Sequence, residues 1–98
     1  MSRRRVVVTG VGVLSPVGND TASYWDALTN GRSGIDLIRS FDTSAHDVKI
    51  AGEVKDFDPT VVLDRKEVRR NDPFVHYAVY VAQQAFQASG LDMGQIDP

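Results

Sequence analysis

The sequence contains no cysteine. This excludes disulfide bonds, thiolate metal sites and a cysteine nucleophile within these 98 residues. It also means that thiol content gives no information about the redox compartment. Any chemistry carried by this stretch of chain has to use other side chains.

The chain also lacks a long apolar run and a strong charge of either sign. No stretch approaches the ~20 apolar residues that span a bilayer, so we expect no membrane segment. A formal net charge of −2 gives no global electrostatic case for nucleic acid. The start, MSRRRVVVTGVGVL, superficially resembles a signal peptide, but its apolar run is short, holds two glycines and lacks an A-x-A-type cleavage site. We therefore expect a cytoplasmic protein that binds neither a membrane nor nucleic acid.

Several catalytic motifs are missing as well. The sequence has no Walker A loop, no G-x-S-x-G and no S-x-x-K. Its only histidines, His46 and His76, stand alone and are interpreted as surface or packing residues; Asp47 beside His46 has no evident third metal-ligand partner. The residues themselves therefore predict no metal site and no catalytic group.

One segment does look like a nucleotide-binding turn. In RVVVTGVGVLSPVG, Gly10 and Gly12 fit the first two glycines of G-x-G-x-x-G, but Ser15 takes the third place and Pro16 follows it. A helix cannot run straight through this proline, so no helix N-terminus would face a pyrophosphate. We favour a buried strand that ends in a tight glycine turn over a dinucleotide site.

The first half of the chain alternates strand and helix signals. Val6–Thr9 is a β-rich block too continuous for a half-exposed strand, which predicts a strand buried on both faces. A helix is expected from an N-cap within residues 19–21 to a stop at Asn30-Gly31. After the loop NGRSGI, residues 46–54 predict a second strand, in which Gly52 indicates a bulge or a close backbone approach.

Two helix starts lie in the last third. Asp64 is placed to cap a short basic helix, RKEVRRN, and Asp72-Pro73 supplies the N-cap and first residue of a helix that continues to Ser89 and ends at Gly90. Its apolar stripe is expected to face a core, with small residues that permit close packing. The stripe consists of Phe74, Tyr77, Ala78, Val81, Ala82, Ala85, Phe86 and Ala88.

The short basic helix would gather four cationic side chains on one side. They are Arg65, Lys66, Arg69 and Arg70, at positions i, i+1, i+4 and i+5. Asp64 and Glu67 partly neutralise them. The pattern alone leaves two interpretations open: a solvated face, or a docking surface for an acidic partner.

The number of elements is small for an independent domain. Two strand signals and an alanine-rich helix are few elements for a closed core of sheet and helices. Residues 92–98, DMGQIDP, read as a loop, and nothing after them would cover the long helix. We therefore expect an α/β chain that is a piece of a larger domain.

Five segments together resemble one known family. They are RVVVTGVGVLSPVG, YWDALTNGRSGI, IRSFDT, DRKEVRRND and FVHYAVYVAQQAFQASGL. They occur in order from Arg5 to Leu91 and are similar to the N-terminus of the β-ketoacyl-acyl carrier protein synthases, with the elongating type II enzymes as the nearest type. The resemblance implies that residues 1–98 form the N-terminal portion of the first ketosynthase half, with no complete second half. The family fold is thiolase-like, with mixed sheets and helices in α-β-α-β-α layers.

The resemblance also implies a chemistry, the decarboxylative Claisen condensation of fatty acid synthesis. An acyl group passes to an active-site cysteine, malonyl-carrier protein loses CO₂, and the carbanion attacks the thioester with help from two histidines and a backbone oxyanion hole. None of these residues can be assigned here, because the chain has no cysteine and His46 and His76 lie outside the family's histidine motifs. The 98-residue chain alone is expected to be inactive, and no dissociable cofactor is implied.

The partner implied by the resemblance is acyl carrier protein. RKEVRR matches the family's basic carrier-docking cluster, so Arg65, Lys66, Arg69 and Arg70 are the expected contacts. The full enzyme would use acyl and malonyl thioesters and form a homodimer. The family commonly has glutamine at the position of His76 and Met-Asp-Arg or Met-Asp-Ala at Asn71-Asp72-Pro73. Two alternatives stay open: a non-catalytic partner subunit of the chain-length-factor or polyketide synthase type, and an autonomous binding module.

Overall fold

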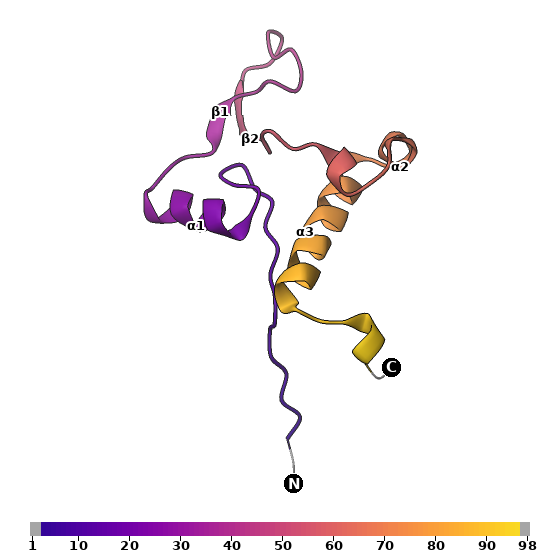
Figure 1. Ribbon diagram of the computed structural model, residues 1–98. Helices are drawn as coiled ribbons and strands as arrows, with labels where there is room; N and C mark the ends of the chain where they lie inside the picture. The colour runs from indigo at the N-terminus through magenta and orange to yellow at the C-terminus, as the bar shows by residue number, and fades with distance from the viewer. Residues whose placement is uncertain (1–2, 97–98) are drawn as a thin grey trace. The chain divides into compact units, whose positions relative to one another are not determined.

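The computed structural model describes residues 3–96 (Figure 1). The chain divides into two compact units: one contains Met1–Gly12 and Pro59–Pro98, and the other is Val13–Asp58. The ends of the 1–98 segment, and with them the last residues of the expected terminal loop, lie outside the described residues.

The first unit is built on α3, Pro73–Ser89, the long helix expected from the sequence. Asp72 occupies the N-cap with an extended backbone, although its side chain makes no capping hydrogen bond, and Pro73 is the first helical residue. Gly90 ends the helix in the left-handed conformation, with φ of 68°, which glycine adopts without a steric penalty. Both predicted ends of this helix are confirmed.

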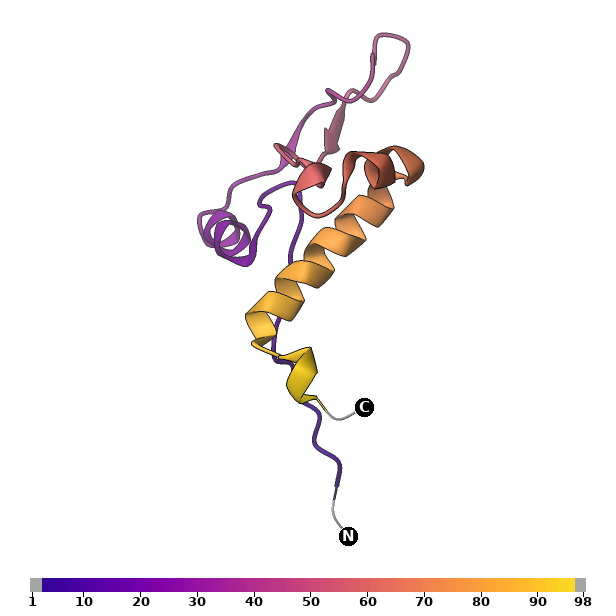
Figure 2. The ribbon, with the colours of Figure 1, turned by 45° about the vertical axis from the view of Figure 1, so that its right-hand side comes forward.

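The N-terminal segment runs along α3 in both ribbon views (Figures 1 and 2). A Cβ on Gly12 would lie 2.9 Å from the carbonyl carbon of Val81 and closer still to its oxygen. A Cβ on Gly10 would lie 2.7 Å from the backbone nitrogen of Ser89. Real Cβ atoms essentially never approach other atoms this closely, so only glycine lets the segment pack on the helix.

The buried strand predicted at Val6–Thr9 is wrong for the chain as it stands. Val6, Val7 and Val8 are 92%, 67% and 83% exposed. A strand buried on both faces needs strand neighbours and a covering layer on each side. No strand in residues 3–96 pairs with this segment, so it stays extended without becoming a strand.

The predicted core face of α3 is also largely uncovered. Phe74 is 69% exposed and Phe86 44% exposed, whereas Val81 and Ala85, beside the N-terminal segment, are half-buried. The stripe is placed as its helical spacing requires, but the described residues supply too few neighbours to bury it. The prediction of a buried face is therefore wrong here for lack of packing partners.

Three short helical elements accompany α3. The 3₁₀ helix η1, Pro59–Val61, contacts both α3 and the short helix α2, Arg65–Arg70. The 3₁₀ helix η2, Met93–Gln95, follows α3 where the sequence suggested only a loop. The Asp92 carboxylate starts η2 by accepting a 2.9 Å hydrogen bond from the Gly94 N–H.

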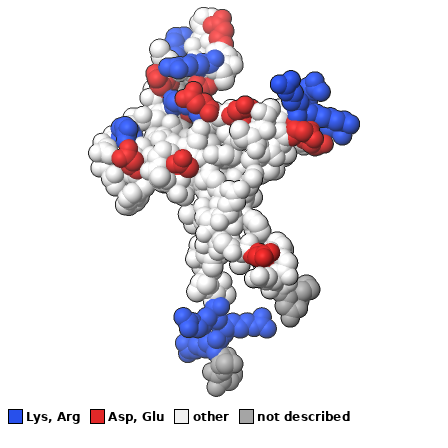
Figure 3. All heavy atoms as spheres, in the orientation of Figure 1, with Lys and Arg blue, Asp and Glu red and all other residues white. Residues whose placement is uncertain are grey.

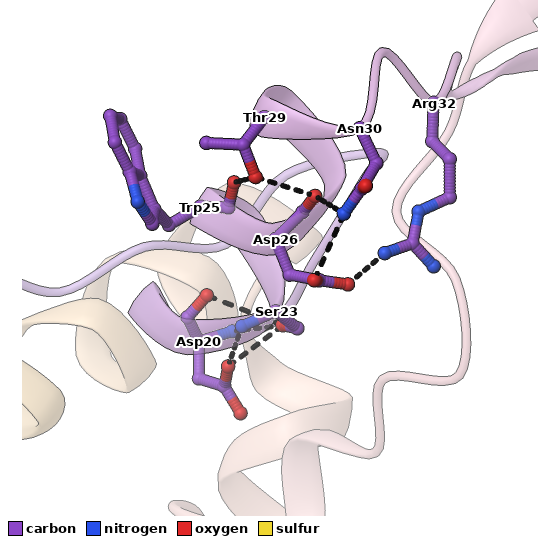
Figure 4. A network of polar contacts seen from close by, with 7 residues as sticks. All are labelled: Asp20, Ser23, Trp25, Asp26, Thr29, Asn30 and Arg32. Carbon is purple, nitrogen blue, oxygen red and sulfur yellow. Dashed lines mark hydrogen bonds and ion pairs between the residues drawn. The ribbon is translucent and has the colours of Figure 1, made fainter.

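The second unit begins with helix α1, Thr21–Thr29. Asp20 and Ser23 form a capping box, in which the Asp20 carboxylate accepts the Ser23 N–H at 2.7 Å and the Ser23 hydroxyl accepts the Asp20 N–H at 3.4 Å (Figure 4). The backbone and side-chain bonds from Ser23 lower the pKa of Asp20. At the other end, Asp26 accepts hydrogen bonds from the Asn30 amide and pairs with Arg32 (Figure 4). The N-cap expected within residues 19–21 and the stop at Asn30-Gly31 are both confirmed.

The only strands in the described residues form one antiparallel pair. β1, Ile35–Leu37, pairs with β2, Ile50–Gly52, with Ile35 opposite Gly52 and Leu37 opposite Ile50. The expectation of a strand within residues 46–54 is confirmed at its centre, whereas β1 was not foreseen. Gly52 sits in regular register rather than in a bulge, and a Cβ there would lie 3.1 Å from Cγ of Pro16.

Lys55 ties the second unit together. Its ammonium group donates to three backbone carbonyl oxygens, those of Pro16 at 3.2 Å, Gly34 at 3.0 Å and Glu53 at 3.1 Å. The Asn19 side-chain amide in turn donates to the Lys55 carbonyl at 2.8 Å. One half-buried cation thus joins the turn before α1, the segment before β1 and the segment after β2.

The described residues thus combine helices with a small antiparallel sheet. This agrees with a partial α/β chain. The mixed sheet expected from the family resemblance does not occur within residues 3–96. In the same range, no helix combines the length and apolarity that a bilayer crossing needs.

Candidate functional site

The helix that carries the predicted site forms where the sequence placed it. The Asp64 carboxylate accepts the Glu67 N–H at 2.8 Å, which satisfies one free donor at the start of α2. At the other end the Asn71 side chain donates to the Glu67 carbonyl at 2.8 Å. Side-chain hydrogen bonds from both flanking residues therefore support a helix of only six residues.

All four predicted site residues lie on α2, and all four are exposed. We call Arg65, Lys66, Arg69 and Arg70 the basic cluster. In Figure 3 it appears as the blue group at the upper right, where Figure 1 shows α2, with acidic atoms beside it. The four residues of the predicted docking surface therefore lie on one short helix.

Only one of the four cations in the basic cluster forms an ion pair within the described residues. Arg70 lies 3.8 Å from Glu67, an exposed i,i+3 pair of the kind that contributes 0–1 kcal/mol at most. Within residues 3–96, Arg65, Lys66 and Arg69 make no ion pair. Such a group attracts an anionic surface over roughly 8–10 Å at physiological salt, and the attraction weakens as salt rises.

The structure adds a residue that the sequence left as a surface or packing histidine. His76, in the first turn of α3, is 7% exposed, and its Nε2 lies 3.1 Å from the Val68 carbonyl oxygen of α2. A carbonyl can only accept, so Nε2 carries the proton and donates it. Helix spacing could place His76 at the start of α3. Its bond to α2 depends on how the chain turns at Asn71, which no local pattern encodes.

The other histidine has a different setting. His46 is exposed, and its ring lies edge-on to that of Phe41 with centroids 5.6 Å apart. Within the described range, no three His, Asp or Glu side chains are grouped to hold a metal ion.

The turn that resembled a nucleotide-binding loop uses its own polar groups. Ser15 and Gly18 exchange backbone hydrogen bonds of 2.9 and 3.3 Å, and the Val17 N–H donates to the Ser15 hydroxyl at 3.2 Å. Helix α1 begins only at Thr21. The N–H groups of Ser15, Val17 and Gly18 are thus engaged within the turn, and the helix starts several residues after Pro16 rather than directly at the glycine turn.

Comparison with known sequences gives a consistent set of relatives. The chain is 48% identical over 95 residues to 3-oxoacyl-(acyl-carrier-protein) synthase 2 of Coxiella burnetii, which covers 97% of this chain and 23% of that protein. It is 45% identical over 97 residues to the enzyme of the same name from Synechocystis, covering 99% of this chain and 23% of the relative. The chain therefore spans about a quarter of the length of these relatives.

Solved structures described as ketosynthases are similar in fold to this chain. A structure described as the ishigamide ketosynthase/chain length factor matches 97% of this chain and 24% of its own, with a TM-score of 0.86 and 36% identity. A second, a type II polyketide synthase acyl-carrier protein in complex with its ketosynthase, matches 99% of this chain and 25% of its own, with a TM-score of 0.72 and 30% identity.

The family itself follows from a match along nearly the whole chain. The profile of the family described as β-ketoacyl synthase, N-terminal domain, matches residues 3–98. This agrees with the segments from Arg5 to Leu91 whose order and spacing suggested the family. The chain belongs to the β-ketoacyl synthase family, and its residues 3–98 match the N-terminal domain of that family.

Proposed function

We propose that this chain is the N-terminal portion of the first half of a β-ketoacyl-acyl carrier protein synthase with the layered thiolase-like fold. The whole protein would elongate acyl chains in fatty acid synthesis by condensing an enzyme-bound acyl group with malonyl-carrier protein. Loss of CO₂ from the malonyl group leaves a carbanion, which attacks the acyl thioester and releases the enzyme's thiolate. Relatives at 45% and 48% identity carry the name of this enzyme, which supports the assignment.

The cysteine and histidines of that reaction lie outside these 98 residues on this proposal. The chain has no cysteine, and its histidines occupy a packing position and an exposed loop. We therefore infer that the chain alone is inactive and contributes scaffold and a docking surface to a homodimeric, cytoplasmic enzyme. Neither role calls for a dissociable cofactor.

The observation that carries the docking role is the basic cluster on α2. Three of its four cations have no ion-pair partner among the described residues, and all four are exposed. A related ketosynthase has been solved in complex with its acyl-carrier protein. An acidic carrier protein would find here a local positive surface on a chain whose net charge is −2.

Charge reversal in the full-length protein tests this role. Arg65→Glu with Lys66→Glu should raise KM for acyl carrier protein on the order of tenfold at low salt and less at high salt, with kcat unchanged. The matched control is Arg3→Glu with Arg4→Glu, which changes the same charge at another exposed pair of the first unit. An unchanged KM at low salt for the α2 variant, or an equal rise for the control, contradicts docking at the basic cluster.

A second candidate is a non-catalytic, chain-length-factor-type partner subunit. The favouring observation is the likeness to a structure described as ketosynthase/chain length factor. The two candidates differ in the remainder of the chain: the enzyme needs a nucleophilic cysteine and two later histidines, whereas the partner subunit has lost the cysteine. The two candidates are distinguished by whether the full-length protein catalyses condensation in the absence of a partner subunit.

A further inference from the structure

Among the described residues, His76 is the one buried polar or charged side chain. Its hydrogen bond to the Val68 carbonyl connects the first turn of α3 to the middle of α2. Burying an imidazole without a partner costs free energy, so the position is tolerated because of this bond.

The Val68 carbonyl needs this partner. In a helix the last four carbonyl groups have no N–H four residues later within the helix. Val68 belongs to this group, because α2 ends at Arg70 and Asn71 has already turned to an extended conformation, with φ of −120° and ψ of 149°. His76 therefore satisfies a carbonyl that the short helix leaves open.

The bond also constrains the direction of α2. A helix of six residues is too short to be stable by itself and takes its orientation from tertiary contacts. The His76–Val68 bond is a direct contact between α2 and the long helix, and α2 also contacts η1. Val68 is followed directly by Arg69 and Arg70, so this contact lies within one turn of half of the basic cluster.

We infer that His76 is a positioning residue: by donating from Nε2 to the Val68 carbonyl, it holds α2 in the orientation that presents the basic cluster to a carrier protein. This inference rests on the proposed docking function. His76 touches neither substrate nor carrier in this role and acts through α2. Neutral imidazole with its proton on Nε2 and imidazolium both make the bond, so substitution rather than pH is the appropriate test.

The test uses the full-length protein with two variants of one residue. His76→Leu keeps apolar bulk but removes the donor, whereas His76→Gln keeps an N–H donor on a side chain of similar reach. Gln83→Leu, at an exposed position of α3, is the matched control. Each is assayed with acyl carrier protein substrates and with a small acyl thioester that lacks the carrier, and hydrogen exchange of the α2 amides is followed in parallel.

The expected pattern is specific to positioning. Loss of one such bond should raise KM for the carrier-linked substrate about 3- to 10-fold in His76→Leu and speed α2 amide exchange. His76→Gln should restore both to within about twofold, and kcat/KM for the small thioester should stay unchanged in all variants. In the Arg65→Glu, Lys66→Glu background, His76→Leu should add little, because both changes act through α2.

The outcomes also distinguish failure of the positioning role from failure of the proposed docking function. If charge reversal raises the carrier KM but His76→Leu does not, docking stands and the positioning role is overturned. If neither change affects the carrier KM, the docking function fails and this inference fails with it. If His76→Leu lowers kcat/KM for the small thioester as much as for the carrier-linked substrate, the variant has general damage to the fold and the positioning role is overturned. The same conclusion holds if His76→Gln fails to restore KM for the carrier-linked substrate and the rate of α2 amide exchange.

Discussion

At the scale of single residues, Gly12 illustrates how a familiar motif can serve packing. Its added Cβ would meet the Val81 carbonyl group at 2.9 Å or less, and backbone atoms of a helix cannot move aside individually. Gly12→Ala should therefore lower the free energy of unfolding of the full-length protein by about 1–3 kcal/mol, the usual range for overpacking. The measurement is the shift in the urea or thermal midpoint.

Gly94→Ala is the matched control for that change. The nearest atom to a Cβ on Gly94 is a side-chain oxygen of Asp92 at 3.3 Å, which can move, so the effect should stay within about 0.5 kcal/mol. If Gly12→Ala proves as mild as Gly94→Ala, the N-terminal segment does not pack on α3 as the structure shows.

Lys55 is a second residue whose role is structural. Replacing it with methionine keeps the apolar stem but leaves three half-buried carbonyl groups without their shared donor. The expected loss is about 1–3 kcal/mol of unfolding free energy, measured by denaturant unfolding of the full-length protein. Lys49→Met is the control, because the Lys49 ammonium also donates to two carbonyl groups, at 2.8 Å each, but on an exposed loop where water replaces it. Equal losses in the two variants would show that the Lys55 contacts are also replaced by water.

Glu53 shows how backbone N–H groups can fix a loop through one carboxylate. It accepts the N–H of Arg39 at 2.9 Å and that of Ser40 at 3.2 Å. Hydrogen bonding by the Ser40 side chain, followed by the Arg39 N–H, holds the pKa of Glu53 below its ordinary value of 4.5. Because the folded state lowers this pKa, the contribution to stability is present above pH about 4.5 and is lost as the pH falls through the lower, folded value.

At the scale of elements, local signals predicted helices better than strands. The starts at Asp20, Asp64 and Asp72-Pro73 and the stop at Gly90 each depend on chemistry within one turn, so they can be identified in the sequence. β1 forms because it pairs with β2, some fifteen residues later in the chain. Its own run of residues is too short for an alternating pattern that would predict a strand.

At Val6–Thr9, by contrast, a strand was predicted and none forms. Its composition is that of a buried strand, but a strand also requires hydrogen-bonding neighbours, and the described residues offer none. The sequence thus indicated what the segment is suited to form, whereas its surroundings determine what it forms in this chain.

The candidate site shows the same limit on a smaller scale. Helical spacing alone placed the four cations of the basic cluster on one short helix, and the structure has them there. His76 could not be assigned to that site from the sequence, because its bond to Val68 depends on the path of the chain between α2 and α3. The sequence therefore predicted which helix carries each residue, but it did not predict which residues of different helices are in contact.

At the scale of the whole molecule, the described chain lacks a hydrophobic core. Ala27, at 3% exposure, is its only buried apolar residue, and large apolar side chains such as Phe74, Trp25 and Val8 are more than half exposed. The chain exposes 8076 Å². Two separate compact domains of half its mass would together expose about 6,700 Å². Burial at roughly 25 cal/mol per Å² is the main force that stabilises a fold, and little of it is realised here.

The 98-residue chain expressed alone should therefore unfold without cooperativity. In a urea titration followed by circular dichroism, its helical signal should decline gradually, and it should bind a hydrophobic dye already in native buffer because the faces of α3 and of the N-terminal segment are exposed. The full-length protein, measured in parallel, should give a sigmoidal transition and bind little dye. A single reversible transition of the isolated monomer, with a flat baseline and a slope of about 1 kcal/mol/M or more, would show instead that these residues form an independent domain. That result would favour the autonomous binding module over a segment whose core is completed by the rest of a synthase.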